Sequence, residues 1–564
     1  MKNAQQINQL EKLLLAMLYG TTLLVLPYTV SDPINLPKMV LLVVMAGALT
    51  GILLSDRKSL ETKAHKPLIT IGILFISNLL ILLTISRLTF SESLYGTSGR
   101  NTGVATYVSF TVVAVACALI SNEKFIRKVF TSFLLIGMTL LIYGFFQYFG
   151  LEPFPYINVY QSNVFGTFGN PNFQSSFMGM LAVIGAAFVL NSSLKFSHRI
   201  VFMVLVGSSL LGVYLTNSIQ GFFNFAFGIL FIVFFYFKTT GRKFLAKVTL
   251  VLSFFGALFL IASFFKLGPL ADVLYKGSMA ARVYYWKTAV KIAIDHPITG
   301  VGMDQYGDWL RVYRSSEQVT TNLTADSAHN IYLDVLSSGG FPLFALFCSF
   351  TLLTIFSIIR VSRRKELPSG NYIALSGLWI AFQAQSLISI SQIGVAIWGW
   401  VFAGLLIGYE INTREDSVST PEGKTKVNFE TKGRKKAAVV FRPQLIIATS
   451  VGLTLGLIIA LPPFFSAQHY YNAFKTSDAR VIKAAASLQP YNRNSFLQVA
   501  GILMSNKFEK DALDVANEAV VHFPNSFAAW KVIAELSEKG SKAQNIAIRK
   551  LHTLDPNNPA YVLP

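Results

Sequence analysis

The stretch "DSAHNIYLDVLSSGG", residues 326–340, places an acid, a histidine and an amide directly before an apolar run that ends in a glycine pair. A neutral imidazole at His329 can take a proton from an attacking hydroxyl, and Asp326 could orient the ring or share the proton transfer. Asn330 could bind a glycan or shape the loop. A structural interpretation competes with this chemistry: Asp326 or Ser327 caps a helix, and His329 merely lies at a membrane interface.

Arginines supply the second kind of chemistry. The planar guanidinium fits phosphate oxygens through several donors, which makes Arg100, Arg282 and Arg311 candidates for binding a pyrophosphate. Arg311 and Arg314 are three residues apart and are expected to share one face of a helix. Arg282 begins the helical pattern "RVYYWKTAVKIAID", so an amphipathic helix on the membrane surface, with Arg282 contacting lipid headgroups, is the alternative.

Three further polar stretches accompany these residues. "GTFGNPNFQSS" brings Asn170 and Asn172, which could bind a glycan or shape the loop, to the start of an apolar run. "TNSIQG" contains Gln220. In "DHPITGVG", His296 precedes a proline and two glycines, which predicts a tight bend with an architectural role. No second histidine, no Ser-His-Asp spacing and no paired-aspartate motif accompanies His329, so a hydrolase and a metal-dependent enzyme are disfavoured. No metal and no cofactor are expected.

The elements that must position these residues are apolar. Runs of 17 to 22 residues recur along the chain, each long enough to cross a hydrocarbon core of about 30 Å as a helix. Together they predict an all-α polytopic membrane protein with 12 to 13 spans. The thirteen candidate runs lie near 13–30, 37–54, 67–85, 103–120, 129–149, 172–190, 200–216, 221–237, 246–265, 341–360, 371–390, 393–409 and 444–462.

The basic residues that give the formal net charge of +20 are distributed unevenly between alternate loops. When alternate loops are assigned to opposite sides, one set holds 24 Lys and Arg residues, whereas the short loops of the other set hold 3. This asymmetry predicts a cytoplasmic N-terminus and argues against nucleic acid as a partner. The short loops of the second set, expected at the outer face, are 31–38, 86–102, 150–171, 217–220 and 391–392.

The polar segments divide the chain. Residues 1–410 are expected to form the membrane domain, in which 266–340 is an outer loop too long for a simple connector. Residues 411–442 read as a flexible cytoplasmic linker, 443–463 as the last span and 464–564 as an outer helical-repeat domain. In that tail, Pro490, Pro524 and Pro556 recur at intervals of 34 and 32 residues, which resembles tetratricopeptide repeats. The tail could cap the membrane domain or dock a partner or acceptor.

Cys117 and Cys348 lie in apolar runs and suggest no redox chemistry.

Taken in order, "GTFGNPNFQSSF", "RVYYWKTAVKIAIDHPITGVGMDQY" and "AHNIYLDVLSSGG" resemble the O-antigen ligase and O-antigen polymerase superfamily of membrane glycosyltransferases, over roughly 86–410. The resemblance implies a GT-C-like helical fold and metal-independent transfer of a glycan from an undecaprenyl-pyrophosphate carrier to an acceptor hydroxyl. It places the reaction on the outer face of a bacterial inner membrane. His329 matches the family base and Arg282 the family pyrophosphate ligand.

One departure from the family pattern is Gln220, which stands where many members carry an arginine. Pyrophosphate binding would then depend on Arg282, Arg311 or Arg100. A ligase, a polymerase and a protein O-oligosaccharyltransferase would share this donor and differ in the acceptor, which could be a lipid, a glycan or a protein. A membrane transporter is the alternative from another class, but it would need ionisable residues within the spans, which here are nearly free of charge.

Overall fold

A computed structural model of the chain describes residues 2–55, 63–86, 89–152, 164–191, 193–268, 271, 278–320, 323–418 and 443–561. This part of the chain is helical and holds no strand, which confirms the all-α prediction. Most of the predicted linker, residues 419–442, lies outside the described residues.

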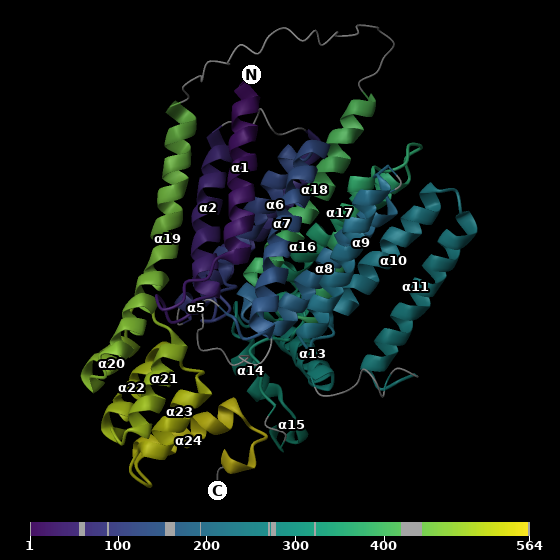
Figure 1. The fold of residues 1–564 in the computed structure, drawn as a ribbon. Helices are drawn as coiled ribbons and strands as arrows, with labels where there is room; N and C mark the ends of the chain where they lie inside the picture. The colour runs from purple at the N-terminus through teal and green to yellow at the C-terminus, as the bar shows by residue number, and fades with distance from the viewer. Residues whose placement is uncertain are drawn as a thin grey trace.

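The helices run in chain order from the N-terminal bundle to a small C-terminal domain (Figure 1). Their bounds are α1 Lys2–Leu23, α2 Asn35–Ser55, η1 Lys63–His65, α4 Lys66–Ile85, α5 Phe90–Tyr95, α6 Val104–Ile120, α7 Glu123–Tyr148, η2 Gly166–Phe168, α8 Pro171–Leu190, α9 Phe196–Leu215, α10 Gln220–Thr239, α11 Lys243–Phe264, α13 Ser278–Asp295, α14 Tyr306–Tyr313, α15 Ser316–Thr320, α16 Ile331–Ser362, α17 Gly370–Ile388, α18 Ile393–Val418, α19 Pro443–Lys475, α20 Ala479–Ala486, α21 Arg493–Ser505, α22 Glu509–His522, α23 Phe527–Leu536, α24 Lys542–Leu554 and η3 Pro559–Tyr561.

Each of the thirteen predicted spans overlaps a helix, although α1 ends at Leu23, seven residues before the predicted end of the first span. Within the described residues, ten helices are long and apolar enough to cross a membrane, which supports a multi-pass membrane protein. The other three are α1, α6 and α17. Helix α6 has 17 residues, and α17 carries buried polar side chains such as Gln385, which a helix inside a bundle can retain when they are hydrogen-bonded.

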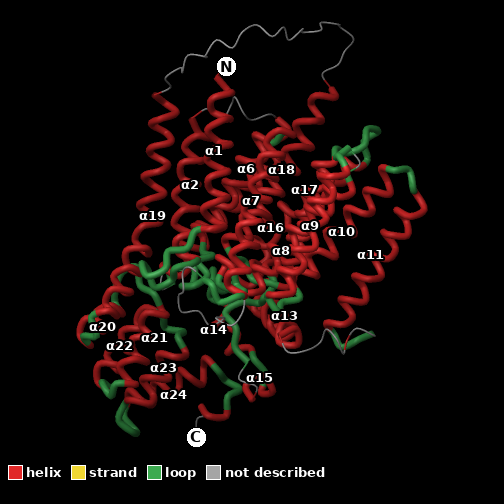
Figure 2. The backbone as a smooth tube through the Cα atoms, in the orientation of Figure 1, coloured by secondary structure: helices red, strands yellow, loops and turns green. Residues whose placement is uncertain are grey.

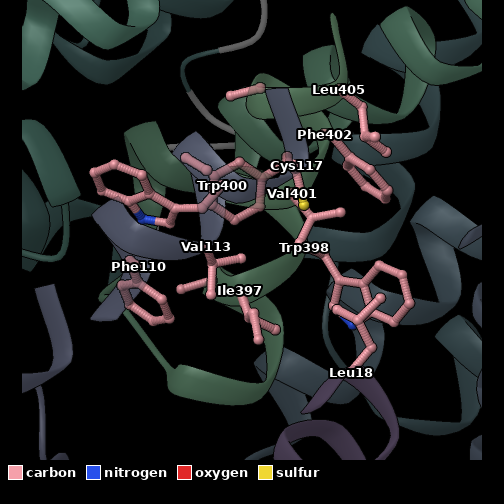
Figure 3. Close-up of a cluster of buried hydrophobic side chains, with 14 of the residues drawn as sticks. Leu18, Phe110, Val113, Cys117, Ile397, Trp398, Trp400, Val401, Phe402 and Leu405 are labelled. Carbon is pink, nitrogen blue, oxygen red and sulfur yellow. The ribbon is translucent and has the colours of Figure 1, made fainter. Parts of the chain in front are cut away.

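Helix α18 forms the centre of the membrane domain. Trp398, Val401 and Phe402 on this helix pack with Phe110 and Cys117 of α6 in a buried apolar cluster (Figure 3). Cys117 is fully buried among these side chains, as expected of a cysteine that acts as a small hydrophobic residue.

Helix α19 lies at the edge of the bundle against α2 (Figure 1). Glycines on both helices allow this close contact: a Cβ atom at Gly452 would lie 2.1 Å from the carbonyl oxygen of Gly47, and one at Gly51 would lie 2.1 Å from that of Ala448. Such small-residue contacts let backbones of membrane helices approach closely. Helix α19 therefore holds the C-terminal domain to the bundle through α2.

The C-terminal domain is a stack of helices in which each of α21 to α24 packs on its neighbour in sequence. Pro490, Pro524 and Pro556 each lie three residues before the start of a helix, namely α21, α23 and η3. The predicted proline spacing is therefore a structural period. Whether these pairs are tetratricopeptide repeats stays a prediction.

Candidate functional site

The loops that were expected to share one face do meet at one end of the bundle, where the longest loops gather (Figure 2). Asn35 Nδ2 donates to the carbonyl of Gly99 at 2.6 Å, and Gln392 Nε2 donates to Asn35 Oδ1 at 3.0 Å. Lys38 Nζ donates to the carbonyl of Thr167 at 2.5 Å. The N-terminus lies at the opposite end of the bundle (Figure 1).

The long segment that follows α11 folds onto these loops and is clamped to a break in α16. Gly340 has φ 65°, so α16 is interrupted there, and the carbonyls of Ser337 and Ser338 lose their helical partners. The amides of Val301 and Gly302 donate to these two carbonyls at 2.9 and 3.0 Å. The "DHPITGVG" bend is therefore architectural, as predicted, and it fixes the helix whose first turn follows His329.

His329 sits in a left-handed backbone conformation, φ 52°, immediately before α16. Its ring stacks on Tyr285 of α13 with centroids 5.6 Å apart, and its amide donates to Ser327 Oγ at 3.0 Å. Burial, together with the nearby charges of Arg282 and Arg100, lowers the pKa of His329 to about 4. The imidazole is therefore neutral at pH 7 and can accept a proton.

Asp334, in the first turn of α16, holds the loop that carries His329. Its carboxylate accepts hydrogen bonds from Ser327 Oγ at 2.8 Å and from the amide of Ala328 at 2.7 Å. The helix cap is Asn330, whose Oδ1 accepts from the amide of Leu333 at 3.1 Å. The prediction of Asp326 or Ser327 as N-cap was wrong, because α16 begins at Ile331, several residues later than that motif required.

Asp326 contributes through its backbone. Its carbonyl accepts a hydrogen bond from Arg100 Nη1 at 2.6 Å, while its side chain is exposed. Within the described part of the chain, the Asp326 carboxylate makes no hydrogen bond or ion pair, so the structure does not bring it into contact with His329.

Arg282 lies on α13, one turn before Tyr285, and is 6% exposed. Among the described residues it has no carboxylate partner, its Nε makes no hydrogen bond, and one terminal nitrogen contacts the sulfur of Met279. Helix α13 packs against α16, and the Arg282 side chain is buried within the protein. A buried guanidinium without an anion is suited to bind one from outside.

Unlike Arg282, Arg100 has a carboxylate partner that partly neutralises its charge. Its guanidinium pairs with Asp304 at 3.4 Å, and Asp304 also accepts a hydrogen bond from the amide of Thr97 at 2.9 Å. Burial alone would lower the pKa of Arg100, but the carboxylates of Asp304, Asp334 and Asp326 raise it above its usual value. Arg100 therefore anchors the loop before His329 and adds positive charge near the ring.

Arg311 and Arg314 do not share a helix face, contrary to expectation. Helix α14 ends at Tyr313, and Arg314 is extended with ψ 144°. Arg314 forms a buried bidentate pair with Asp555, and the guanidinium of Arg311 lies 4.4 Å from the ring centre of Phe527. Both arginines therefore contact the C-terminal domain.

Asn170, Asn172 and Gln220 belong to a polar network between α8, α10 and α17. Asn170 caps α8 by accepting from the amide of Asn172 at 2.9 Å. Asn172 Oδ1 accepts from Ser218 Oγ at 2.7 Å, and Gln220 Oε1 accepts from Gln385 Nε2 at 3.1 Å. Two residues further along α17, the carbonyl of Leu387 accepts from Asn330 Nδ2 at 3.0 Å. Gln220 thus has a structural partner and lies in the layer that supports Asn330.

Some residues of the site were not singled out from the sequence. Asp334 organises the His329 loop, Tyr285 stacks on the ring, and the fully buried Lys38 lies 5.1 Å from the ring centre of Phe168 and holds the "GTFG" turn. Their signal in the sequence was modest: Asp334 and Lys38 are each an isolated charge in the first turn or so of a mostly apolar helix. Among the described residues, no three His, Cys, Asp or Glu side chains converge as metal ligands.

Comparison with known families agrees with this geometry. Residues 202–348 match the family described as O-antigen ligase. This segment is therefore an O-antigen ligase family region. The O-antigen ligase segment runs from α9 into α16 and contains Arg282, Tyr285 and His329, whereas Arg100 and the C-terminal domain lie outside it. The match over this segment supports a membrane glycan-transfer function. No curated protein matches the chain in a sequence search.

Proposed function

We propose that the protein is a membrane glycosyltransferase of the O-antigen ligase type. It transfers a glycan from an undecaprenyl-pyrophosphate carrier to a hydroxyl of an acceptor, without a metal ion. The observation that carries the proposal is the neutral imidazole of His329, stacked on Tyr285 and close to the buried guanidinium of Arg282, which has no carboxylate partner among the described residues.

The roles follow from this arrangement. His329 takes the proton of the acceptor hydroxyl as its oxygen attacks the anomeric carbon of the donor glycan. The bond from that carbon to the pyrophosphate oxygen breaks, and the electron pair leaves with the lipid pyrophosphate. Arg282 binds the departing anion and stabilises the charge that develops on it.

The candidate residues for binding the pyrophosphate differ in whether their side chains already have a partner within the protein. Arg282 is the first candidate for the pyrophosphate because it lacks a carboxylate among the described residues. Arg100 remains a second candidate, although Asp304 partly neutralises it. Arg311 and Gln220 are weaker candidates, since Phe527 and Gln385 already occupy their side chains.

The orientation is also part of the proposal. The 24 basic residues of one set of loops favour a cytoplasmic location for that end, so His329 and the C-terminal domain would face outward from a bacterial inner membrane. Residues 1–410 would form the transferase domain and 464–564 the outer repeat domain.

The site geometry is compatible with a ligase, a polymerase or a protein O-oligosaccharyltransferase, because these enzymes share the donor chemistry. Deleting the gene and identifying the glycoconjugate that loses its glycan, or loses glycan length, identifies the acceptor.

The test is reconstitution of the full chain in lipid nanodiscs with a lipid-linked glycan and the acceptor from the deletion strain. We expect glycosylated acceptor and free undecaprenyl pyrophosphate in equal amounts, at an unchanged rate in the presence of EDTA. Transport of the lipid-linked glycan without any bond cleavage would overturn the proposal, and a rate that collapses in EDTA would overturn metal independence.

A further inference from the structure

A groove lies at the boundary between the membrane domain and the C-terminal domain. Its walls come from the α5 segment with the turn that follows it, from the outer end of α19 and from the start of α21. Tyr95 and Tyr491 supply aromatic rings on two of these walls. The groove is therefore formed only when the two domains are docked.

Hydrogen bonds and ion pairs hold the walls in a fixed arrangement. Arg493, at the first position of α21, pairs with Glu92 at 2.7 Å and also with Asp308. Asn494 Nδ2 donates to the carbonyl of Ser98 at 3.3 Å. A groove between walls tied in this way is preorganised, so little free energy is lost in ordering it around a ligand.

Several polar groups of the groove lack hydrogen-bond partners among the described residues. Asn101 is 5% exposed, and its Oδ1 accepts no hydrogen bond. Among the described residues, the hydroxyls of Ser91, Tyr95, Ser466 and Ser495 make no hydrogen bond either. A buried acceptor without a donor needs one from outside the chain. The groove is therefore lined by hydrogen-bond donors and acceptors that lie beside aromatic rings.

The charged residues of the groove indicate which class of ligand it can bind. Among its described lining residues, Glu92 is the charged one, and Arg493 and Gln305 already bind it. An anionic ligand would find no free cation there, and an apolar ligand would leave the hydroxyls unbonded. An uncharged polyhydroxyl compound satisfies both the hydroxyls and the rings.

The position of the groove connects it to the transferase site. Asn101 directly follows Arg100, which donates to the carbonyl of Asp326, three residues before His329. We propose that this groove is a glycan subsite, built jointly by the membrane and C-terminal domains, that binds the sugar chain of the donor or the acceptor beside the transfer site. This proposal rests on the proposed function.

Two substitutions test the groove from opposite walls. Asn101 has φ 57°, so Asn101→Gly removes the unpartnered amide while keeping a backbone conformation that glycine adopts easily. Ser495→Trp fills the groove from α21. Ser505→Trp is the matched control, because Ser505 lies on the same helix and is exposed away from the groove.

Binding is measured by saturation-transfer NMR and titration on the full chain in nanodiscs, without any transfer reaction. One probe is the glycan released from the host's lipid-linked pool by mild acid, and the other is the unmodified acceptor from the deletion strain. The probe that binds the wild type identifies which substrate uses the groove.

We expect Asn101→Gly to weaken binding about 2- to 10-fold, the equivalent of one hydrogen bond, and Ser495→Trp to abolish it. Ser505→Trp should bind as the wild type does. If neither probe binds the wild type, or if binding is unchanged in both Asn101→Gly and Ser495→Trp, the proposal is overturned. Because binding is measured without any transfer reaction, failure of the transferase assignment would leave this result readable on its own.

Discussion

At the residue scale, the central feature is an imidazole held neutral by burial and by two cations. Burial and the guanidinium groups of Arg282 and Arg100 lower the pKa of His329 to about 4, which keeps the proton-accepting nitrogen free but makes it a weak base. A general base is most effective when its pKa lies near the working pH. A pyrophosphate bound at Arg282 would offset that cation, so the donor itself would strengthen the base.

This gives a pH prediction with a definite sign. The acid limb of kcat/KM, which reports the free enzyme, should lie near pH 4, because transfer is lost as His329 becomes protonated. The acid limb of kcat, which reports the donor complex, should lie at higher pH, because a nearby anion favours the imidazolium. Steady-state transfer rates from pH 3.5 to 8 check this. Coincident limbs for the two parameters would contradict the coupling between donor and base.

Arg282 allows a graded test of charge and shape. Arg282→Gln should lower kcat about 10²- to 10³-fold, because it removes a preorganised cation from the leaving group. Arg282→Lys should recover part of the loss, since it restores the charge but not the planar fork of donors. Arg311→Gln, on a side chain that packs on Phe527, should lose much less. Equal losses in Arg282→Gln and Arg311→Gln would show that both cations serve the donor.

At the element scale, the molecule depends on interrupted and closely packed helices. Gly340 breaks α16 where the "DHPITGVG" bend inserts its amides, and the glycines of α2 and α19 allow direct backbone contact. The first of these devices is local to the site. The glycine contacts between α2 and α19 hold α19, which leads into the C-terminal domain, against the bundle (Figure 1).

Gly452→Leu should separate α19 from α2. A Cβ atom there would meet the carbonyl oxygen of Gly47 at 2.1 Å, so the helices must move apart at a cost of about 1–3 kcal/mol or more. The control is Gly256→Leu on α11, where no atom lies within 4 Å of the added Cβ. Thermal unfolding in detergent compares the two variants. A melting temperature for Gly452→Leu equal to that of Gly256→Leu would contradict the close packing.

The sequence predicted the elements better than the contacts between them. Apolar runs located thirteen helices because length and hydropathy are local properties. They did not reveal that α14 stops at Tyr313, which turned Arg314 away from Arg311 and toward Asp555. They also did not reveal that α16 starts at Ile331. The order of the motifs pointed to His329 and Arg282. Tyr285 and Asp334 could be recognised only once the helices were placed, because the partner of Tyr285 is distant in sequence and those of Asp334 lie across a turn.

At the scale of the whole molecule, the C-terminal domain is part of the structure around the site. Arg493 reaches Glu92 and Asp308, and Asp555 pairs with Arg314 immediately after α14. The same segment carries Asp304, which pairs with Arg100 next to the His329 loop. The tail is therefore docked on the segment that supports the site, as a cap would be. The groove at this boundary is the glycan subsite proposed above.

Asp555→Ala should loosen the docked tail. Arg314 and Asp555 are 3% and 0% exposed, and removing one partner of a buried pair costs about 3–5 kcal/mol because the other charge stays buried. Glu535→Ala breaks the exposed Lys531–Glu535 pair and should cost about 0–1 kcal/mol. Hydrogen exchange of α14 and α24 compares the variants. Unchanged protection of both helices in Asp555→Ala would contradict a docking role.

The most direct test of the account concerns His329 as the base. The measurement is the single-turnover rate of glycan transfer by His329→Ala and by His296→Ala, in nanodiscs saturated with lipid-linked glycan and acceptor. His296 belongs to the same long segment but packs on Trp309, so it serves as the control. We predict that His329→Ala slows transfer about 10²- to 10⁴-fold while donor binding is retained, and that His296→Ala transfers within a few-fold of the wild type. A His329→Ala variant that transfers as fast as His296→Ala would contradict the central claim.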